Sequence, residues 1–270
     1  MDWSRIDSLI PEVVNSVREE YIVNNKIIKD DIFKILERHC VVVYYPISDE
    51  TKNRGFHIKR FLEGKLSDFV YINTANSTAE QIFAAAHELG HVWKVADKVW
   101  KKLRTDEKLT EEIEEKIVGR FAAELLMPEE EFKKTFWAHI KNFGFDSSHI
   151  RSDELIRVMV MQMSEYMVPY EAVRRRMLET NIIDDKVGDV LCADENETIS
   201  TIIDEYLKDL NTALDQKSNK KTIPGLRDLI DKAEDSGAVS EYFLSKIKED
   251  FSVEGVKATG QIINLSVEDK

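Results

Sequence analysis

The feature that most constrains the fold is an H-E-x-x-H motif, His87-Glu88-Leu89-Gly90-His91, in an alanine-rich run. Two histidines four residues apart lie one above the other on the same face of an α-helix. One tetrahedral Zn²⁺ can bind both imidazoles at about 2.0–2.1 Å. Glu88 points to the neighbouring edge of the same site, where it can accept a proton from a water that the metal activates. The motif therefore predicts a helix that carries a metal and a general base.

The residues around the motif favour a buried helix. Residues 78–86 are good helix formers, and Ser77 or Thr78 is placed to cap the start of the helix. The apolar positions recur on one broad face and are Ile82, Phe83, Ala86, Leu89 and Val92. Burying two histidines and a glutamate without partners is costly, and a coordinated metal would remove that cost. The alternative is a motif that faces solvent on an ordinary helix.

A further acidic ligand is expected downstream, because zinc that performs chemistry usually has three protein ligands and one open position. Residues 111–126 are predicted to form a second helix, which Pro128 helps to end. The apolar positions of this helix share one stripe and are Val118, Phe121, Ala122, Leu125 and Leu126. Glu111 and Glu115 both project from the core-facing side, whereas Glu112 faces solvent. The spacing leaves Glu111 and Glu115 open as the third ligand.

The run A-H-E-L-G-H, followed downstream by E-x-x-x-x-x-F-A-A-E-L-L-M-P, resembles the ImmA/IrrE family of zinc metallopeptidases. The resemblance covers residues 87–91 and 115–128, takes in a predicted strand at 69–73, and extends to 168–178, which are similar to the segment that closes the family's catalytic domain. It implies a gluzincin-like site in which Glu115 is the third ligand. The family often has Asn or Asp where this chain has Gly119. A missing polar side chain there could loosen the site, but it removes no ligand.

The resemblance also implies a function. Members of this family are typically site-specific endopeptidases that cleave a helix-turn-helix transcriptional repressor and so switch on stress or mobile-element genes. The expected partner is therefore a protein substrate, a DNA-binding repressor, and the expected cofactor is Zn²⁺. Two other classes stay open: a non-catalytic regulator that sequesters a repressor, and a toxin-like effector of a toxin–antitoxin pair. The intact set of His87, His91, Glu115 and the base Glu88 favours the enzyme.

Composition favours a globular protein. No apolar stretch in the 270 residues approaches the ~20 that a membrane helix needs, and the first residues lack the features of a signal peptide, so we expect a cytoplasmic protein. The net charge of −13 argues against a broad nucleic-acid surface and favours a basic protein partner. Cys40 and Cys192 have no C-x-x-C spacing, so we expect two reduced, partly buried thiols.

The pattern of elements predicts an α+β fold, a mostly helical zincin-like domain with a small three-stranded sheet packed on the active-site helix. The predicted strands are 40–46, 56–61 and 69–73, and the further helices are 3–21, 32–39, 132–140, 153–166 and 168–178. His57 alternates with Phe56 and Ile58, so it lies either on the open face of the sheet or near the metal. His39 is expected to end a helix, and neither His139 nor His149 is singled out to stabilise an oxyanion.

The chain is expected to divide into a metallopeptidase domain, residues 1–183, and a C-terminal extension of unknown role, residues 184–270. Residues 181–270 hold 20 acidic and 11 basic side chains, a net charge of −9. Within them, 211–221 is typical of a linker, 224–234 and 239–251 of short helices, and 261–265 of a strand. We expect the extension to regulate or target the activity, and a chain ending near Ile183 to bind zinc and cleave. The run 174–176 of three arginines is interpreted as a solvated helix face.

Overall fold

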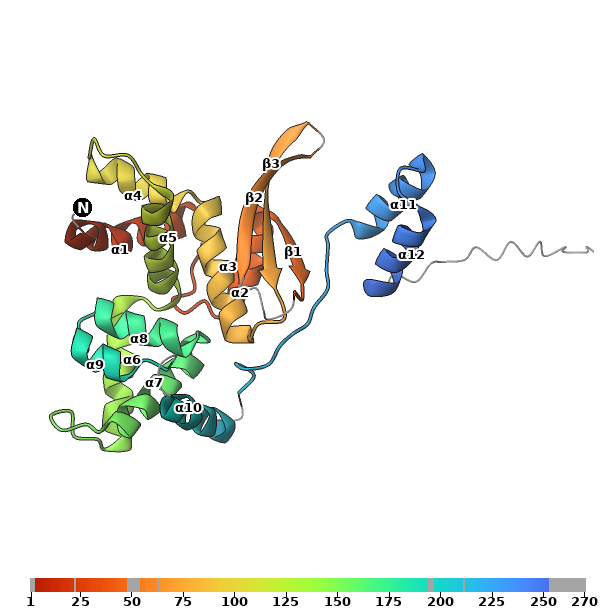
Figure 1. The fold of residues 1–270 in the computed structure, drawn as a ribbon. Coiled ribbons are helices and arrows are strands. Elements are labelled where there is room, and N and C mark those ends of the chain that lie inside the picture. The colour runs from red at the N-terminus through yellow and green to blue at the C-terminus, as the bar shows by residue number, and fades with distance from the viewer. Residues whose placement is uncertain are drawn as a thin grey trace, which may run out of the picture. The chain divides into compact units, whose positions relative to one another are not determined.

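The computed structural model describes residues 3–21, 23–47, 54–62, 64–193, 197–210 and 212–252. The chain divides into two compact units, Met1–Lys221 and Thr222–Lys270, which are described separately. In the described residues the first unit is mostly helical around a three-stranded sheet (Figure 1), so the predicted α+β fold is confirmed.

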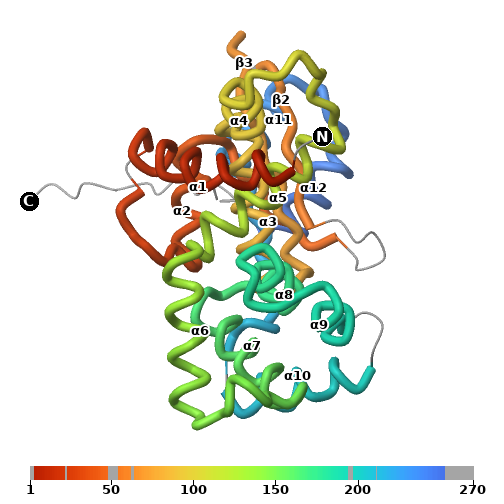
Figure 2. The backbone as a smooth tube through the Cα atoms, turned by 90° about the vertical axis from the view of Figure 1, so that its left-hand side faces the viewer, coloured from red at the N-terminus to blue at the C-terminus, as the bar shows by residue number. Residues whose placement is uncertain are grey.

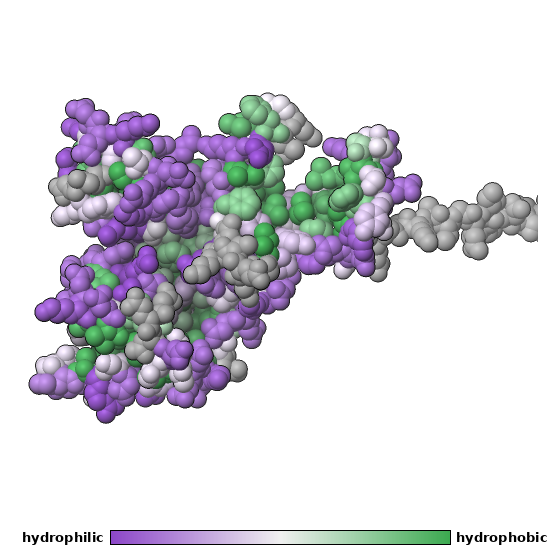
Figure 3. All heavy atoms as spheres, in the orientation of Figure 1, coloured by the Kyte–Doolittle hydropathy of each residue, from purple (hydrophilic) through white to green (hydrophobic). Residues whose placement is uncertain are grey.

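The sheet has the strand order β1-β3-β2, formed by Val41–Tyr45, Lys65–Asn73 and Gly55–Leu62. β1 runs parallel to the central strand β3, and β2 pairs with β3 as an antiparallel hairpin. Both β1 and β2 are therefore edge strands. Alternation along the strands buries Val42, Val70 and Ile72 on one face, and it leaves Phe56 and Ile58 on the other face about two-fifths exposed. Figure 3 shows apolar surface on the hairpin.

Helices α2 (Asp31–His39) and α3 (Thr78–Val92) pack against the sheet, and α3 lies beside the edge strand β2 (Figure 1). α3 begins at a capping box: the Ser77 side chain accepts a hydrogen bond from the Glu80 amide, and the Glu80 carboxylate accepts one from the Ser77 amide. On the other side of α3 lies α5 (Glu111–Leu126), capped by Thr110. Helices α1 (Trp3–Glu20) and α4 (Val95–Leu103) pack against α5 and against each other (Figure 2).

Gly90 allows α3 and α5 to approach closely. A Cβ atom at Gly90 would lie 2.8 Å from Cγ1 of Val118 and 3.0 Å from Cδ1 of Phe121, and both of these side chains are completely buried. Gly90 thus sets the distance between α3, which carries His87 and His91, and α5, which carries Glu115.

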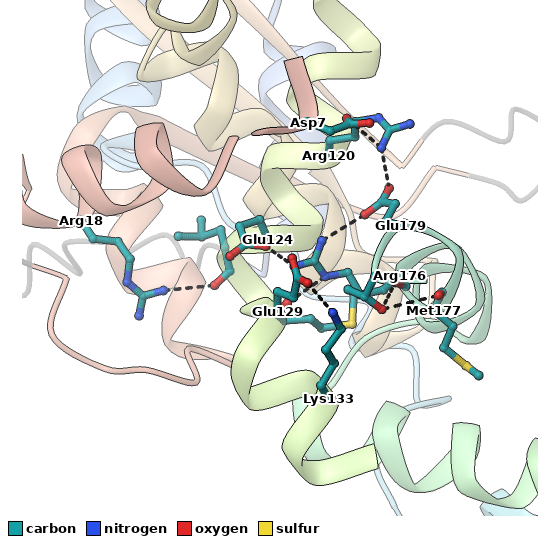
Figure 4. A network of polar contacts seen from close by, with 12 residues as sticks. Asp7, Arg18, Arg120, Glu124, Glu129, Lys133, Arg176, Met177 and Glu179 are labelled. Carbon is teal, nitrogen blue, oxygen red and sulfur yellow. Dashed lines mark hydrogen bonds and ion pairs between the residues drawn. The ribbon is translucent and has the colours of Figure 1, made fainter. Parts of the chain in front are cut away.

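The remaining helices of the first unit form a second layer below the sheet (Figure 2), in the order α6 (Glu129–Phe143), α7 (Ser152–Tyr166), α8 (Tyr170–Glu179), α9 (Asp185–Val190) and α10 (Glu197–Leu210). A buried network of charges joins this layer to α5 (Figure 4). The Arg176 guanidinium donates to Glu124 and to the Met127 carbonyl, and it lies 3.2 Å from Glu179. The expectation of a solvated arginine face is wrong for Arg176, because α8 turns that residue toward α5, while Arg175 is exposed.

The segment that follows α10 packs against the start of α3. The Leu214 and Gln216 carbonyls accept hydrogen bonds from the amides of Ala79 and Thr78, at 3.2 and 2.9 Å. Leu214 is 2 % exposed. The expectation that residues 211–221 form a linker is therefore wrong for 212–221, because these residues supply acceptors for amides that the first turn of a helix leaves unpaired. The compact unit thus extends to Lys221, beyond the expected end at residue 183.

The second unit contains α11 (Leu226–Ser236) and α12 (Glu241–Asp250), which confirm the two short helices expected there. Ile230 and Leu244 are its buried side chains in the described part, and Lys248 pairs with Glu234 at 2.6 Å. The strand expected at 261–265 lies outside the described residues. Cys40 and Cys192 are free and partly buried, as expected. None of the helices described is long and apolar enough to span a membrane.

Candidate metal centre

The two motif histidines and Glu115 converge between α3 and α5. Nε2 of His87 lies 3.0 Å from Oε2 of Glu115, and Nε2 of His91 lies 3.2 Å from Oε1 of the same carboxylate. The two Nε2 atoms are 3.3 Å apart. All three donor atoms lie within 4.8 Å of one another, the one such group of three among the residues that the structure describes. The three side chains thus direct their donor atoms at a common point.

The register of α5 decides which glutamate reaches that point. Glu115 follows the buried stripe back by one turn, and its side chain is half exposed, so one side of the group stays open. Glu111 is exposed and does not join the group. Glu112 pairs with Lys116 at 2.6 Å and is 78 % exposed. Of the two candidates left open by spacing, the structure brings Glu115 to the histidines.

Glu114 is a site residue that the sequence analysis missed. Its Oε1 atom lies 3.2 Å from Nδ1 of His91. A carboxylate on the far ring nitrogen fixes the tautomer and orientation of an imidazole whose other nitrogen faces a metal. In the sequence, Glu114 is one of several acidic residues in the first turn of α5, where the helix dipole favours negative charge anyway. Nothing in the pattern separates it from Glu111 or Glu112.

Glu88 is buried beside the group, with 6 % of its surface exposed. It lies against the start of β2: a Cβ atom on Gly55 would be 3.4 Å from Oε1 of Glu88. Burial, and then the negative charge of Glu115, raise the pKa of Glu88 to about 8. Burial, and then the charge of His91, lower the pKa of His87, which favours the neutral imidazole that binds metals.

His57 lies next to this group. Of the two positions that the strand pattern left open, the open face of the sheet and the neighbourhood of the metal, it occupies the second. Its Nε2 atom is 2.7 Å from Oδ1 of Asp68, across the hairpin. The ring is nearly parallel to that of His91, with an interplanar angle of 11° and 6.2 Å between centroids. The alternation of β2 placed His57 on the face opposite Phe56 and Ile58, but only the packing of that face on α3 shows that it meets the site.

The other histidines do not join the group. His39, at the end of α2 as expected, packs its ring against Tyr21 and Trp93. His139 lies on α6, where Glu165 of α7 is its acidic neighbour. His149 is exposed and pairs with Asp146 at 3.2 Å.

The residues present fit a zinc ion. Two imidazole nitrogens and one carboxylate oxygen form the ligand set of many catalytic zinc sites, and Glu114 supplies the outer partner that such a set requires. At Gly119, a Cβ atom would meet nothing within 4 Å. The absence of a polar side chain there leaves open space and removes none of the three donors.

Comparison with known proteins identifies a family to which the chain is similar. A family model described as the IrrE N-terminal-like domain, a peptidase family, matches residues 36–178, more than half of the chain. The match begins in α2, contains the sheet, α3 and α5, and ends in α8. No curated protein matches the chain.

Proposed function

The chain belongs to the IrrE N-terminal-like peptidase family, and from this premise we propose that it is a zinc-dependent, site-specific endopeptidase. The observation that carries the proposal is the convergence of His87, His91 and Glu115 beside the buried Glu88. The two histidines and Glu115 would hold the metal, and Glu88 would act as the general base. Glu114 would keep His91 in the tautomer that binds it.

A zinc ion held there would polarise the scissile carbonyl and lower the pKa of water from 15.7 toward ~7. Glu88 accepts the proton of the attacking water on its carboxylate and then donates it to the leaving amine. Glu88 is buried beside the three donor groups, so its carboxyl group is placed to exchange a proton with a water bound there. Gly55 has no side chain, so the start of β2 can lie close to both Tyr71 and Glu88: a Cβ atom there would be 2.9 Å from the Tyr71 carbonyl oxygen and 3.4 Å from Oε1 of Glu88.

The substrate is proposed to bind as an extended peptide along the edge strand β2. That strand lies beside α3 and pairs with β3 on one side only, so its other edge can accept a further strand. His57, held by Asp68, would then contact the bound peptide next to His91. The family resemblance proposes a helix-turn-helix repressor as the target, and the net charge of −13 favours such a basic partner.

The test joins metal analysis to cleavage. The wild-type protein and Glu88→Gln should each bind one zinc per chain, but Glu88→Gln should cleave the target at least ~100-fold more slowly, because glutamine cannot accept the proton. The matched control is Glu112→Gln, at an exposed position on α5. Near-normal cleavage by Glu88→Gln would refute the mechanism. Relief of repression by Glu88→Gln without cleavage would show that the protein sequesters its target instead.

A further inference from the structure

A groove between α1 and α4 gathers positive charge in an otherwise acidic protein. Its volume is about 750 Å³. The basic residues that line it are Arg5, Lys98, Lys101, Lys102 and Arg104, against the single carboxylate of Glu12. The whole chain has the opposite balance, with 51 acidic and 38 basic residues. This local excess of cations points to an anionic ligand.

Ion pairs account for only part of this charge. Lys102 pairs with Glu12, and Lys98 pairs with Glu20, each at 2.5 Å, so these two bridges join the antiparallel helices. Lys101 and Arg104 are exposed and form no ion pair within the part of the chain that the structure describes. Their positive charge is therefore available to a ligand in the groove.

The size and floor of the groove indicate what kind of ligand fits. Leu9, which is partly buried, provides an apolar surface between the cations, whereas Val13 beneath it is almost fully buried. The volume lies within the range of about 300–1,000 Å³ that small-molecule sites occupy. A small anion with an apolar body fits this groove better than a macromolecule does.

We propose that the α1–α4 groove binds a phosphorylated small molecule that carries an apolar ring. Lys101 and Arg104 contact the phosphate oxygens, which lysine and arginine bind through charge-assisted hydrogen bonds, and the ring lies on Leu9. None of the lining residues belongs to the metal centre, so this site is separate from the proposed peptidase site. The proposal does not depend on peptidase activity.

Calorimetric titration of the full-length protein tests the site with three probes: adenosine 3′,5′-bisphosphate, fructose 1,6-bisphosphate and adenosine. The nucleoside bisphosphate should bind most tightly, the sugar bisphosphate more weakly, and adenosine without measurable heat. Raising the salt concentration from about 50 to about 300 mM should weaken binding of both bisphosphates, because charges at an exposed groove are screened.

Two charge-matched double variants locate the binding. Lys101→Glu with Arg104→Glu should weaken binding of adenosine 3′,5′-bisphosphate at least tenfold. Lys134→Glu with Lys141→Glu, on the exposed surface of α6, changes the net charge equally and should leave binding unchanged. Circular dichroism of both variants checks the fold, and Glu115→Ala should bind the probe like the wild type.

Several results would overturn the proposal. These are no binding heat up to about 5 mM probe, an equal loss in both double variants, or loss of binding in Glu115→Ala, which would place the anion at the metal centre. Tighter binding of a polyglutamate peptide than of either bisphosphate would assign the groove to an acidic protein segment instead.

Discussion

Replacing Gly90 by alanine tests whether the close approach of α3 and α5 builds the metal centre. The added Cβ atom would lie 2.8 Å from Cγ1 of Val118 and 3.0 Å from Cδ1 of Phe121. Neither side chain can move away easily, because both are completely buried. The helices must therefore separate by several tenths of an ångström, which moves His87 and His91 away from Glu115.

Gly119→Ala is the matched control. It makes the same change within a helix, but its Cβ atom would meet nothing within 4 Å. In both variants alanine gains about 0.5–1 kcal/mol over glycine from helix propensity. Only Gly90→Ala carries the cost of overpacking, about 1–3 kcal/mol. The propensity gain cancels in the comparison, so Gly90→Ala should be less stable than Gly119→Ala by about 1–3 kcal/mol.

Thermal unfolding of the metal-free proteins measures this difference, and about 2–4 °C per kcal/mol is expected for a unit of this size. Competition with a chelator then measures the zinc affinity, which should fall about 10–100-fold in Gly90→Ala, the loss typical of disturbed ligand geometry. Equal stability of the two variants would show that the core accommodates the methyl group and would refute the packing argument. A loss of stability with unchanged zinc affinity would refute the link between helix spacing and the metal centre.

Three further predictions concern the ligands and the end of the first unit. Glu115→Ala should remove most of the zinc measured by elemental analysis, whereas Glu112→Ala should keep it; the opposite result would mean that the exposed face of α5 binds the metal. Glu114→Ala should retain zinc binding but weaken it by about 10–100-fold in chelator competition, since His91 loses its outer partner; unchanged affinity would show that the contact is incidental. A chain ending at Lys221 should unfold at the same temperature as the full chain, whereas one ending at Ile183 should unfold at a much lower temperature. The shorter chain lacks five buried aliphatic side chains, those of Leu191, Ile199, Ile203, Leu207 and Leu214, each contributing about 1.5–3 kcal/mol. Equal unfolding temperatures for the two would show that this segment adds no stability.

The sequence was sufficient to predict the local features of this protein. A repeat of apolar residues every three or four positions located α3 and α5, Ser77 was one of two predicted caps, and alternation located the strands. The H-E-x-x-H spacing placed two histidines on one helix face without reference to any other element, because helical geometry fixes neighbours four residues apart. The family resemblance rested on such local runs, and the matching family model confirms it.

Contacts between distant segments could not be read in this way. Glu114 and Glu115 are adjacent in the sequence, and only the packing of α5 on α3 gives them different partners. His57 reaches His91 because its strand face covers α3. Arg176 is buried because α8 folds back on α5.

The polar segment at 212–221 is a second case in which the local sequence and the tertiary packing point to different structures. Its composition is that of a linker, yet it packs along α3 because the first turn of that helix has amide groups without helical partners. The sequence by itself determined the elements and the chemistry they carry, since both depend on neighbours a few residues apart. The tertiary structure alone decided which of these groups meet, because that depends on how helices and strands far apart in the chain pack together.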